Sequence, residues 1–330
     1  MQVARITSAQ TALTRTPGKD PASYITALIR SVQEWLRTYA KPRPAGDQFI
    51  RSDEDNSPAA HIELLEKLLS VLDVLIPDPE ISPPTLWHPG LYKPDIFISP
   101  TAPHEILGVT GWQTATTGPR YLQTEFPRAM RYTGGRFKVT AGPKIPPLPE
   151  GFEELGVEEQ TILRKHHWEA VVQQHHMTLI KKDVRYPTGL AHPYAPLFIE
   201  PILLVPRTWE NGIIYLKSSL VFIQLNWDIL SDPGVPCPLT FSPEEITLTL
   251  EDTWRRESYN TRVGSLSREL GVDLGGTVGE VEKFELVKRK SDEFRDKWDA
   301  AAEGGPYPFQ DGGRSLMTWG TTGWSSSMDV

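Results

Sequence analysis

Apolar residues recur at helical spacing over six stretches of the chain, and each stretch predicts an amphipathic α-helix. The stretches are residues 21–39, 58–76, 158–182, 213–230, 243–270 and 280–302. Three of them begin with a capping residue followed by proline: Asp20-Pro21, Ser57-Pro58 and Ser242-Pro243. Proline is favoured at the first helical position because the N–H it lacks would have no partner there. Glu245 completes a capping box with Ser242. In the last stretch we expect these apolar positions to be buried: Val281, Phe284, Val287, Phe294 and Trp298.

Two short apolar segments, residues 95–98 and 106–110, predict β-strands instead. Only the seven residues 99–105 separate them, and Pro100 and Pro103 fall in this gap, so we expect an antiparallel hairpin. Residues 113–150 predict loops. The fold class that follows is mainly α with a small β-hairpin.

The composition of the chain predicts one domain with two flanking segments. We expect residues 20–303 to form a single helical domain. Residues 1–19 lack Asp and Glu and carry three basic residues. We interpret them as a flexible N-terminal arm in preference to a transit peptide. Residues 304–330 are rich in Gly, Ser and Thr, so we expect a flexible tail. We interpret its Trp319 and Trp324 as loose hydrophobic residues, with anchoring of a partner as the alternative.

Charge and cysteine content exclude several classes of protein. Of the 330 residues, 34 are Lys or Arg and 42 are Asp or Glu, which gives a net charge of −8. An acidic chain is a poor match for the phosphate backbone of nucleic acids. The single cysteine, Cys237, excludes an intramolecular disulfide and an all-cysteine zinc site. No apolar run reaches the ~18–20 residues of a membrane-spanning helix. We therefore expect an intracellular protein, cytoplasmic or mitochondrial, whose partners are neither nucleic acid nor membrane.

The most informative segment, residues 86–98, reads Leu-Trp-His-Pro-Gly-Leu-Tyr-Lys-Pro-Asp-Ile-Phe-Ile, and residues 107–113 read Leu-Gly-Val-Thr-Gly-Trp-Gln. Together they resemble the catalytic and metal loops of kinase-like small-molecule phosphotransferases. More specifically, they resemble the fungal aminoglycoside-phosphotransferase-like family that includes the altered-inheritance-of-mitochondria protein 9 group. Its members commonly read Leu-Trp-His-Pro-Asp-Leu-His-x-x-Asn-Ile-Phe and then Ile-Ile-Asp-Trp-Gln.

Further short phrases extend the resemblance over residues 20–310. They are residues 148–152, Trp209-Glu210-Asn211-Gly212, Asn226-Trp227 and Pro236-Cys237-Pro238. The resemblance implies the C-lobe of the protein-kinase-like, or aminoglycoside phosphotransferase, fold. The N-lobe that holds the nucleotide in this superfamily has no counterpart in the sequence. None of the 87 residues before His88 reads like its lysine-bearing strand, and the chain has no phosphate-binding glycine motif.

The chain departs from the family pattern at the positions that carry the chemistry. The resemblance puts the catalytic base at Gly90, the metal-loop aspartate at Gly111 and the loop asparagine at Asp95. Glycine has no side-chain oxygen. Gly90 therefore cannot deprotonate an acceptor hydroxyl, and Gly111 cannot hold Mg²⁺ on phosphates. We therefore expect no cofactor. Residual Mg²⁺ binding at Asp95 is the alternative to a solvated or capping carboxylate, and we favour the latter.

The other candidate residues have structural interpretations as well. We expect His88 to brace the loop, as it does in the family. Tyr92, Trp112 and Gln113 are candidates for lining a ligand site, although packing is the more typical role of a tyrosine at position 92. Cys237 lies between two prolines without a neighbouring histidine, which is typical of an inert buried thiol.

Four histidines, His166, His167, His175 and His176, share one predicted helix. His167 and His175 lie within about 80° of each other but about 12 Å apart along the axis. That separation is too large for one zinc ion, whose bonds are about 2 Å long.

Three functional hypotheses follow from these observations. The first is a degenerate phosphotransferase, or pseudokinase, that cannot transfer phosphate and binds a small molecule or a protein partner. The second is a kinase fold repurposed for cofactor-free chemistry, such as an isomerisation or cyclisation in fungal specialised metabolism. The third is a truncated paralogue without function.

Overall fold

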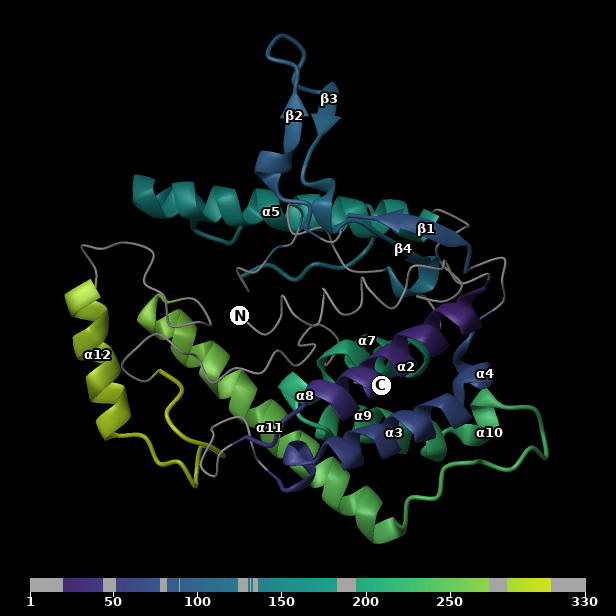
Figure 1. Ribbon diagram of the computed structural model, residues 1–330. Helices are drawn as coiled ribbons and strands as arrows, with labels where there is room; N and C mark the ends of the chain where they lie inside the picture. The colour runs from purple at the N-terminus through teal and green to yellow at the C-terminus, as the bar shows by residue number, and fades with distance from the viewer. Residues whose placement is uncertain are drawn as a thin grey trace. The chain divides into compact units, whose positions relative to one another are not determined.

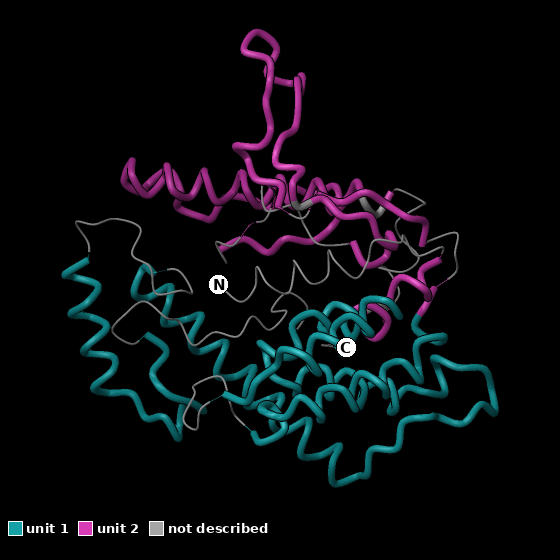
Figure 2. Tube along the Cα trace, viewed as in Figure 1, with its two compact units in different colours: residues 1–16, 26–75, 200–330 teal, residues 17–25, 76–199 magenta. Residues whose placement is uncertain are grey.

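The computed structural model describes residues 20–43, 52–77, 82–88, 90–123, 130, 132, 136–182, 194–272 and 284–309. They are mainly helical, with two short antiparallel strand pairs (Figure 1). The chain divides into two compact units (Figure 2). Unit 1 comprises residues 1–16, 26–75 and 200–330, and unit 2 comprises residues 17–25 and 76–199. Each unit is described by itself, and a single domain over residues 20–303 stays a prediction.

Unit 1 is built from helices. They are α3 (Pro58–Ser70), α4 (Leu72–Leu75), α8 (Thr208–Asn211), α9 (Ile214–Leu225), α10 (Trp227–Leu230), α11 (Pro243–Leu270) and α12 (Phe284–Asp296), together with most of α2 (Pro21–Tyr39) and part of α7 (Ala195–Leu204). The centre of the unit is α9, which packs against α3 and α11. Leu216, Leu220 and Ile223 of α9 are fully buried, so this helix carries apolar residues on more than one face.

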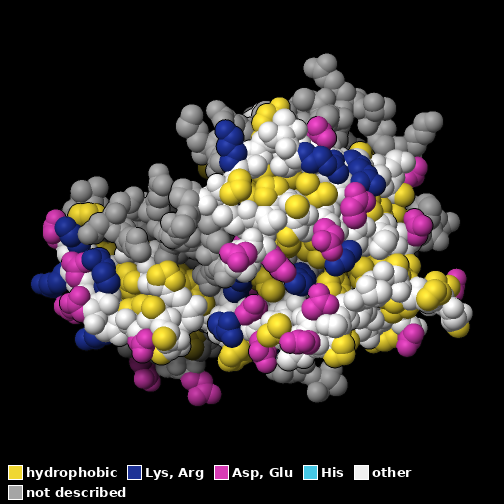
Figure 3. Space-filling model, turned by 60° about the horizontal axis from the view of Figure 1, so that its bottom comes forward, with side chains coloured by type: hydrophobic (Ala, Val, Ile, Leu, Met, Phe, Trp, Pro, Cys, Tyr) yellow, Lys and Arg dark blue, Asp and Glu magenta, His cyan; other side chains and the backbone are white. Residues whose placement is uncertain are grey.

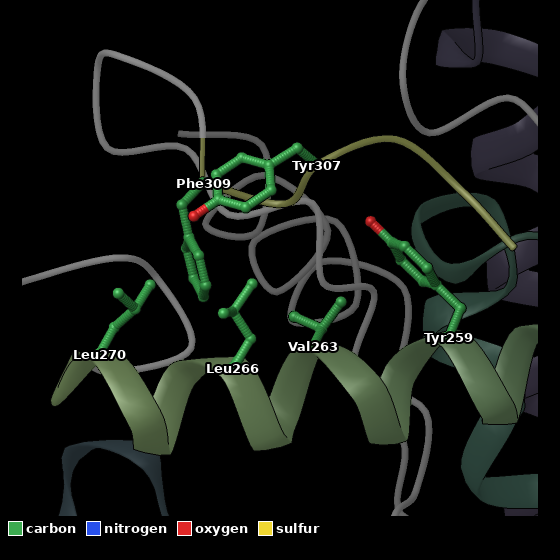
Figure 4. Close-up of a cluster of buried hydrophobic side chains, with 6 residues drawn as sticks. All are labelled: Tyr259, Val263, Leu266, Leu270, Tyr307 and Phe309. Carbon is green, nitrogen blue, oxygen red and sulfur yellow. The ribbon is translucent and has the colours of Figure 1, made fainter. Parts of the chain in front are cut away.

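The C-terminal half of α11 forms a second apolar cluster (Figure 4). Tyr259, Val263, Leu266 and Leu270 project from one side of the helix towards Tyr307 and Phe309, and all six are buried. The hydroxyl of Tyr259 donates to the carbonyl of Pro306 at 2.7 Å. Packing therefore extends beyond residue 303, where we expected the flexible tail to begin. Trp319 and Trp324 lie outside the described residues.

Unit 2 contains both strand pairs, and its longest described helix is α5 (Val157–Lys182). Strand β1 (Pro84–Trp87) pairs with β4 (Thr116–Pro119), and β2 (Ile96–Ile98) pairs with β3 (Ile106–Val109). The β2–β3 hairpin stands away from the rest of unit 2 (Figure 2). This hairpin confirms the predicted strand pair, whereas the β1–β4 pair was not predicted, because residues 113–150 were expected to be loops.

The predicted helix starts are confirmed by their hydrogen bonds. The carboxylate of Asp20 accepts the N–H of Ser23 at 2.7 Å. The hydroxyl of Ser57 accepts the N–H of Ala60 at 3.3 Å. The predicted capping box is also present: Ser242 Oγ accepts the N–H of Glu245 at 3.2 Å, and the Glu245 carboxylate accepts the N–H of Ser242 at 2.9 Å.

Several helix interiors differ from the prediction. The stretch 58–76 breaks at Val71, whose N–H bonds back three residues to Leu68 in place of the regular four. The stretch 213–230 breaks at Asn226, whose N–H bonds both the carbonyl of Phe222, four residues back, and that of Ile223, three residues back. Helices α7 and α8 were not predicted. In α12 the expected burial of Phe284 is wrong, since the side chain is 49% exposed.

Helix α12 ends at Asp296, earlier than the predicted residue 302. Its end is set by Lys297 and Trp298, whose N–H groups bond three residues back. Val287, Phe294 and Trp298 pack against the cluster of Figure 4, and Val281 lies outside the described residues.

Candidate functional site

The two strand registers bring the segments of the predicted loop together. The β2–β3 register pairs Ile96 with Val109, so Asp95 and Thr110 lie side by side at the base of the hairpin. The β1–β4 register pairs Trp87 with Thr116, so His88 leaves its strand close to the turn that follows Gly111. The chain thus returns twice to one junction, defined here as His88, Asp95, Thr110, Gly111 and Trp112.

His88 braces this junction, which is the role we expected for it. Its Nε2 lies 2.8 Å from the carbonyl oxygen of Thr110. A carbonyl only accepts, so Nε2 carries the proton. The imidazole also meets the indole of Trp112 edge-on, with 4.9 Å between ring centroids and 70° between planes. Its Nδ1 is buried and has no hydrogen-bond partner among the described residues.

Asp95 uses its carboxylate to cap its own turn. Oδ2 accepts the backbone N–H of Tyr92 at 2.9 Å. The main chain of Asp95 also ties the hairpin, since its carbonyl accepts the N–H of Thr110 at 2.9 Å. Asp95 thus caps its turn, while residual Mg²⁺ binding at its carboxylate stays a prediction.

Gly111 lies beside the side chains of Asp95 and His88. Its φ of +84° lies in the left-handed region, which favours glycine. A Cβ at this position would lie 3.0 Å from Oδ1 of Asp95 and 3.1 Å from Nε2 of His88. Both distances are tighter than almost all real Cβ contacts. Any side chain at position 111 would therefore enter the junction and press against its histidine and its carboxylate.

The remaining predicted residues lie around the junction. Trp112 is half-exposed, and its indole N–H donates to the carbonyl of Val109 at 2.8 Å. Tyr92 and Gln113 are exposed, and Gly90 is half-buried in a turn. The structure thus places Trp112 directly against His88, while a ligand-lining role for Tyr92, Trp112 and Gln113 stays a prediction.

The junction supplies one carboxylate where the resemblance implies a magnesium–nucleotide site built from an asparagine and an aspartate. Asp95 supplies its one carboxylate, and one oxygen of that carboxylate already accepts an N–H. A magnesium ion bound between protein and phosphates usually takes one or two carboxylates besides the substrate oxygens. Among the described residues, no group of three or more His, Cys, Asp and Glu side chains could hold a metal ion.

The histidines of α5 make separate structural contacts. His167 Nε2 bonds the carbonyl of Pro146 at 2.7 Å, and the ring of His166 meets Tyr132 edge-on. Burial lowers the pKa of His176. Cys237 is half-buried, less than we expected, and desolvation raises the pKa of its thiol, which disfavours the reactive thiolate.

Sequence reasoning missed a buried polar network in unit 1. Oδ2 of Asp55 accepts from the Arg256 guanidinium at 2.7 Å, and Oδ1 accepts the N–H of Ile213 at 2.8 Å. His61 is fully buried beside them, with Nδ1 at 2.8 Å from Oγ1 of Thr208. Asp55 and Arg256 lie 201 residues apart, so no local pattern could have paired them. The network ties α11 and the segment around Ile213 to Asp55.

The face drawn in Figure 3 carries both acidic and basic side chains. On that face, acidic and basic side chains of the described residues are interspersed with apolar ones. The described helices include none that is both long and apolar enough to cross a membrane.

Comparison with known proteins gives two distant relatives. Both are Aspergillus fumigatus proteins named subtelomeric hrmA-associated cluster protein, one from strain CEA10 and one from strain Af293. Each is 26% identical to this chain over 304 residues. The match covers 87% of this chain but only 56% of each relative, so the chain spans little more than half the length of these relatives. No family model and no solved structure matches the chain.

Proposed function

We propose that this chain is a degenerate phosphotransferase-like protein that does not transfer phosphate and acts by binding a small molecule or another protein. The observation that carries the proposal is the position of Gly111. A side chain at this position would point at Asp95 and His88, and the resemblance expects the metal-loop aspartate there. On this proposal the junction corresponds to the metal loop of the family, with glycine in place of its aspartate.

Two further observations support the proposal. The bond from His88 to Thr110 ties the two loops together, as the resemblance expects of this histidine. The described residues before His88 form helices α2, α3 and α4, a 3₁₀ turn and strand β1. Strand β1 itself is Pro-Thr-Leu-Trp and contains no lysine. The helical part of the chain would, on this proposal, correspond to the C-lobe of the kinase-like fold.

The contributions of the missing groups to the reaction rate are large enough to decide between activity and inactivity. A positioned general base contributes roughly 10²- to 10⁴-fold to the rate of such a reaction. Compensation of phosphate charge by a held metal ion is a separate contribution, and positioning with charge stabilisation supplies nearly all of phosphoryl-transfer catalysis. Glycine at position 90 leaves out the general base, and glycine at position 111 leaves out the aspartate that would hold the metal ion.

The proposal is tested by MgATP turnover, measured as ADP formation with the full chain. We expect no Mg²⁺-dependent turnover, and no rise of the unfolding temperature with MgATP beyond that with Mg²⁺ alone. Asp95→Ala removes the carboxylate of the junction, and Glu105→Ala is the matched control, because it removes an exposed carboxylate from the hairpin loop. Turnover that Asp95→Ala abolishes and Glu105→Ala preserves would overturn the proposal.

A further inference from the structure

A serine hydroxyl lies in the middle of the packed face of α12. Val287 and Phe294 of this helix pack against the cluster of Figure 4. Ser291 comes four residues after Val287 and three before Phe294, so it falls within about 60° of both round the helix. Its Oγ lies 2.9 Å from the hydroxyl oxygen of Tyr307, whose side chain is only 7% exposed. The helix therefore docks through a polar pair set among apolar contacts.

Residues 303–309, which we call the C-terminal strap, carry this tyrosine and join α12 to α11. The indole N–H of Trp298 donates to the carbonyl of Gly305 at 2.9 Å. The guanidinium of Arg295 lies over the ring of Tyr307, 5.7 Å from its centroid. The contact between the two hydroxyl groups is thus one of the bonds that hold α12 on the strap.

Helix α12 itself is only lightly held. None of its residues is fully buried, and Phe284 and Leu286 are 49% and 45% exposed. Elements with so few buried apolar contacts open locally at a low cost in free energy. Opening of α12 would expose Ser291 while the buried core of unit 1 around α9 stays packed.

Three exposed basic residues directly precede this serine: Lys288, Arg289 and Lys290. Charge patterns beside the acceptor residue are a common means by which protein kinases select their substrates. A kinase with an acidic substrate cleft would pair with this basic run through charge-assisted hydrogen bonds. The run and the hydroxyl become available together when α12 opens.

A second serine follows a similar basic sequence but has a different structural setting. Ser258 follows residues 255–257, which read Arg-Arg-Glu. Arg256 is committed to the buried carboxylate of Asp55 at 2.7 Å, and these two side chains are 11% and 1% exposed. Ser258 also lies in the middle of α11, which packs against α9. The structure therefore favours Ser291 over Ser258 as an acceptor.

We infer that Ser291 is a phosphorylation site for a protein kinase that selects basic residues before its serine, and that the phosphate releases α12 from the C-terminal strap. In the transfer, Oγ bonds to the γ-phosphorus of ATP, the bond from that phosphorus to the β-phosphate oxygen breaks, and ADP leaves. The hydroxyl proton passes to the base of the kinase. This inference does not rest on the proposed function.

The release follows from the charge and size of the phosphate. A phosphoserine carries a charge of about −1.5 to −2, and it disrupts a packed apolar contact or a site beside an acidic residue. On the docked helix the phosphate would press against the buried Tyr307 hydroxyl, with Asp292 as its neighbour in the chain. The kinase thus acts on the opened helix, and the phosphate keeps it open.

The first test is phosphorylation of the full chain with MgATP and the catalytic subunit of a kinase that selects basic residues, with the phosphate located by mass spectrometry. We expect modification of Ser291 and none of Ser258. Arg289→Gln should slow incorporation about tenfold or more. Lys297→Gln is the matched control, because it removes an exposed basic residue that follows the serine, and it should leave the rate unchanged. An unmodified Ser291, or equal rates in the two variants, would overturn the inference.

The second test is hydrogen exchange of the phosphorylated chain beside the unmodified one. We expect the amides of residues 284–296 to exchange about tenfold faster or more, with residues 243–258 of α11 unchanged as the internal reference. Tyr307→Phe removes the hydroxyl contact without adding charge, so its effect on the same amides should be smaller. Equal exchange of α12 in the two forms, or slower exchange through pairing of the phosphate with Arg295, contradicts release of the helix.

Discussion

Replacing Gly111 by aspartate should destabilise unit 2 by about 2–4 kcal/mol, although it restores the carboxylate that the resemblance calls for. Two costs add up to this magnitude. A non-glycine residue at φ +84° costs roughly 1–2 kcal/mol, with aspartate at the low end. Forcing a Cβ to 3.0 Å from Asp95 Oδ1 adds roughly 1–3 kcal/mol of overpacking. The two neighbouring carboxylates also repel, which raises their pKa values unless a cation binds between them.

Three comparisons separate these costs. Gly111→Ala keeps the backbone strain and the close contact but adds no charge. Gly111→Asp combined with Asp95→Asn removes the repulsion alone. Gly108→Ala in β3 is the matched control, because a Cβ there meets nothing within 4 Å, and its effect should stay within about 0.5 kcal/mol.

The measurement is urea unfolding followed by circular dichroism, with and without Mg²⁺. If the two units unfold separately, the shift belongs to the transition of unit 2. We expect Mg²⁺ to recover part of the lost stability of Gly111→Asp and none of that of Gly111→Ala. A Gly111→Asp protein as stable as wild type would refute the close approach of Gly111, Asp95 and His88.

Three further predictions concern unit 1. Asp55→Ala leaves a buried guanidinium without its carboxylate and should cost about 3–5 kcal/mol in urea unfolding; a loss below 1 kcal/mol contradicts the buried pair. Gly305→Ala brings a Cβ to 2.9 Å from the Tyr259 ring and should destabilise by about 1–3 kcal/mol, whereas Gly264→Ala, inside α11 with open space, should stabilise by up to about 1 kcal/mol. Burial lowers the pKa of His61 below its usual 6.5, so the unfolded chain binds the proton more readily and stability falls as the pH drops below about 6.5. His61→Gln should reduce the change in unfolding free energy with pH, measured by urea unfolding at several pH values. An equal pH dependence in the two proteins would refute the role of His61.

The helices were predictable where local rules set their ends. Caps at Asp20, Ser57 and Ser242 act within three residues, so the sequence alone located the starts of α2, α3 and α11. The breaks at Val71 and Asn226 left no such signal in the sequence.

The β1–β4 pair was missed for a related reason. Strand β4 reads Thr-Thr-Gly-Pro and shows no alternation of apolar and polar residues. It is a strand because β1 lies beside it, with Thr85 paired to Gly118. Pairing between segments 29 to 35 residues apart follows from the fold and not from the local sequence.

The candidate site was predictable as a set of residues but not in its geometry. The resemblance grouped His88, Asp95 and Gly111, and in the structure a Cβ built on Gly111 would lie 3.0 Å from Asp95 Oδ1 and 3.1 Å from His88 Nε2. The left-handed backbone of Gly111 and the use of the Asp95 carboxylate as a cap depend on the hairpin register. Neither could be derived from spacing.

The most direct test of the central claim is MgATP turnover by the double variant Gly90→Asp with Gly111→Asp, beside wild type. If the two glycines were the only defect, restoring both carboxylates would restore activity. We predict tighter Mg²⁺ binding but no measurable turnover, because the described segments before His88 are helices and a lysine-free strand, so nothing there positions the triphosphate. Robust turnover by the double variant would show that residues of this chain do hold the nucleotide, and would contradict the account of a chain without phosphotransfer machinery.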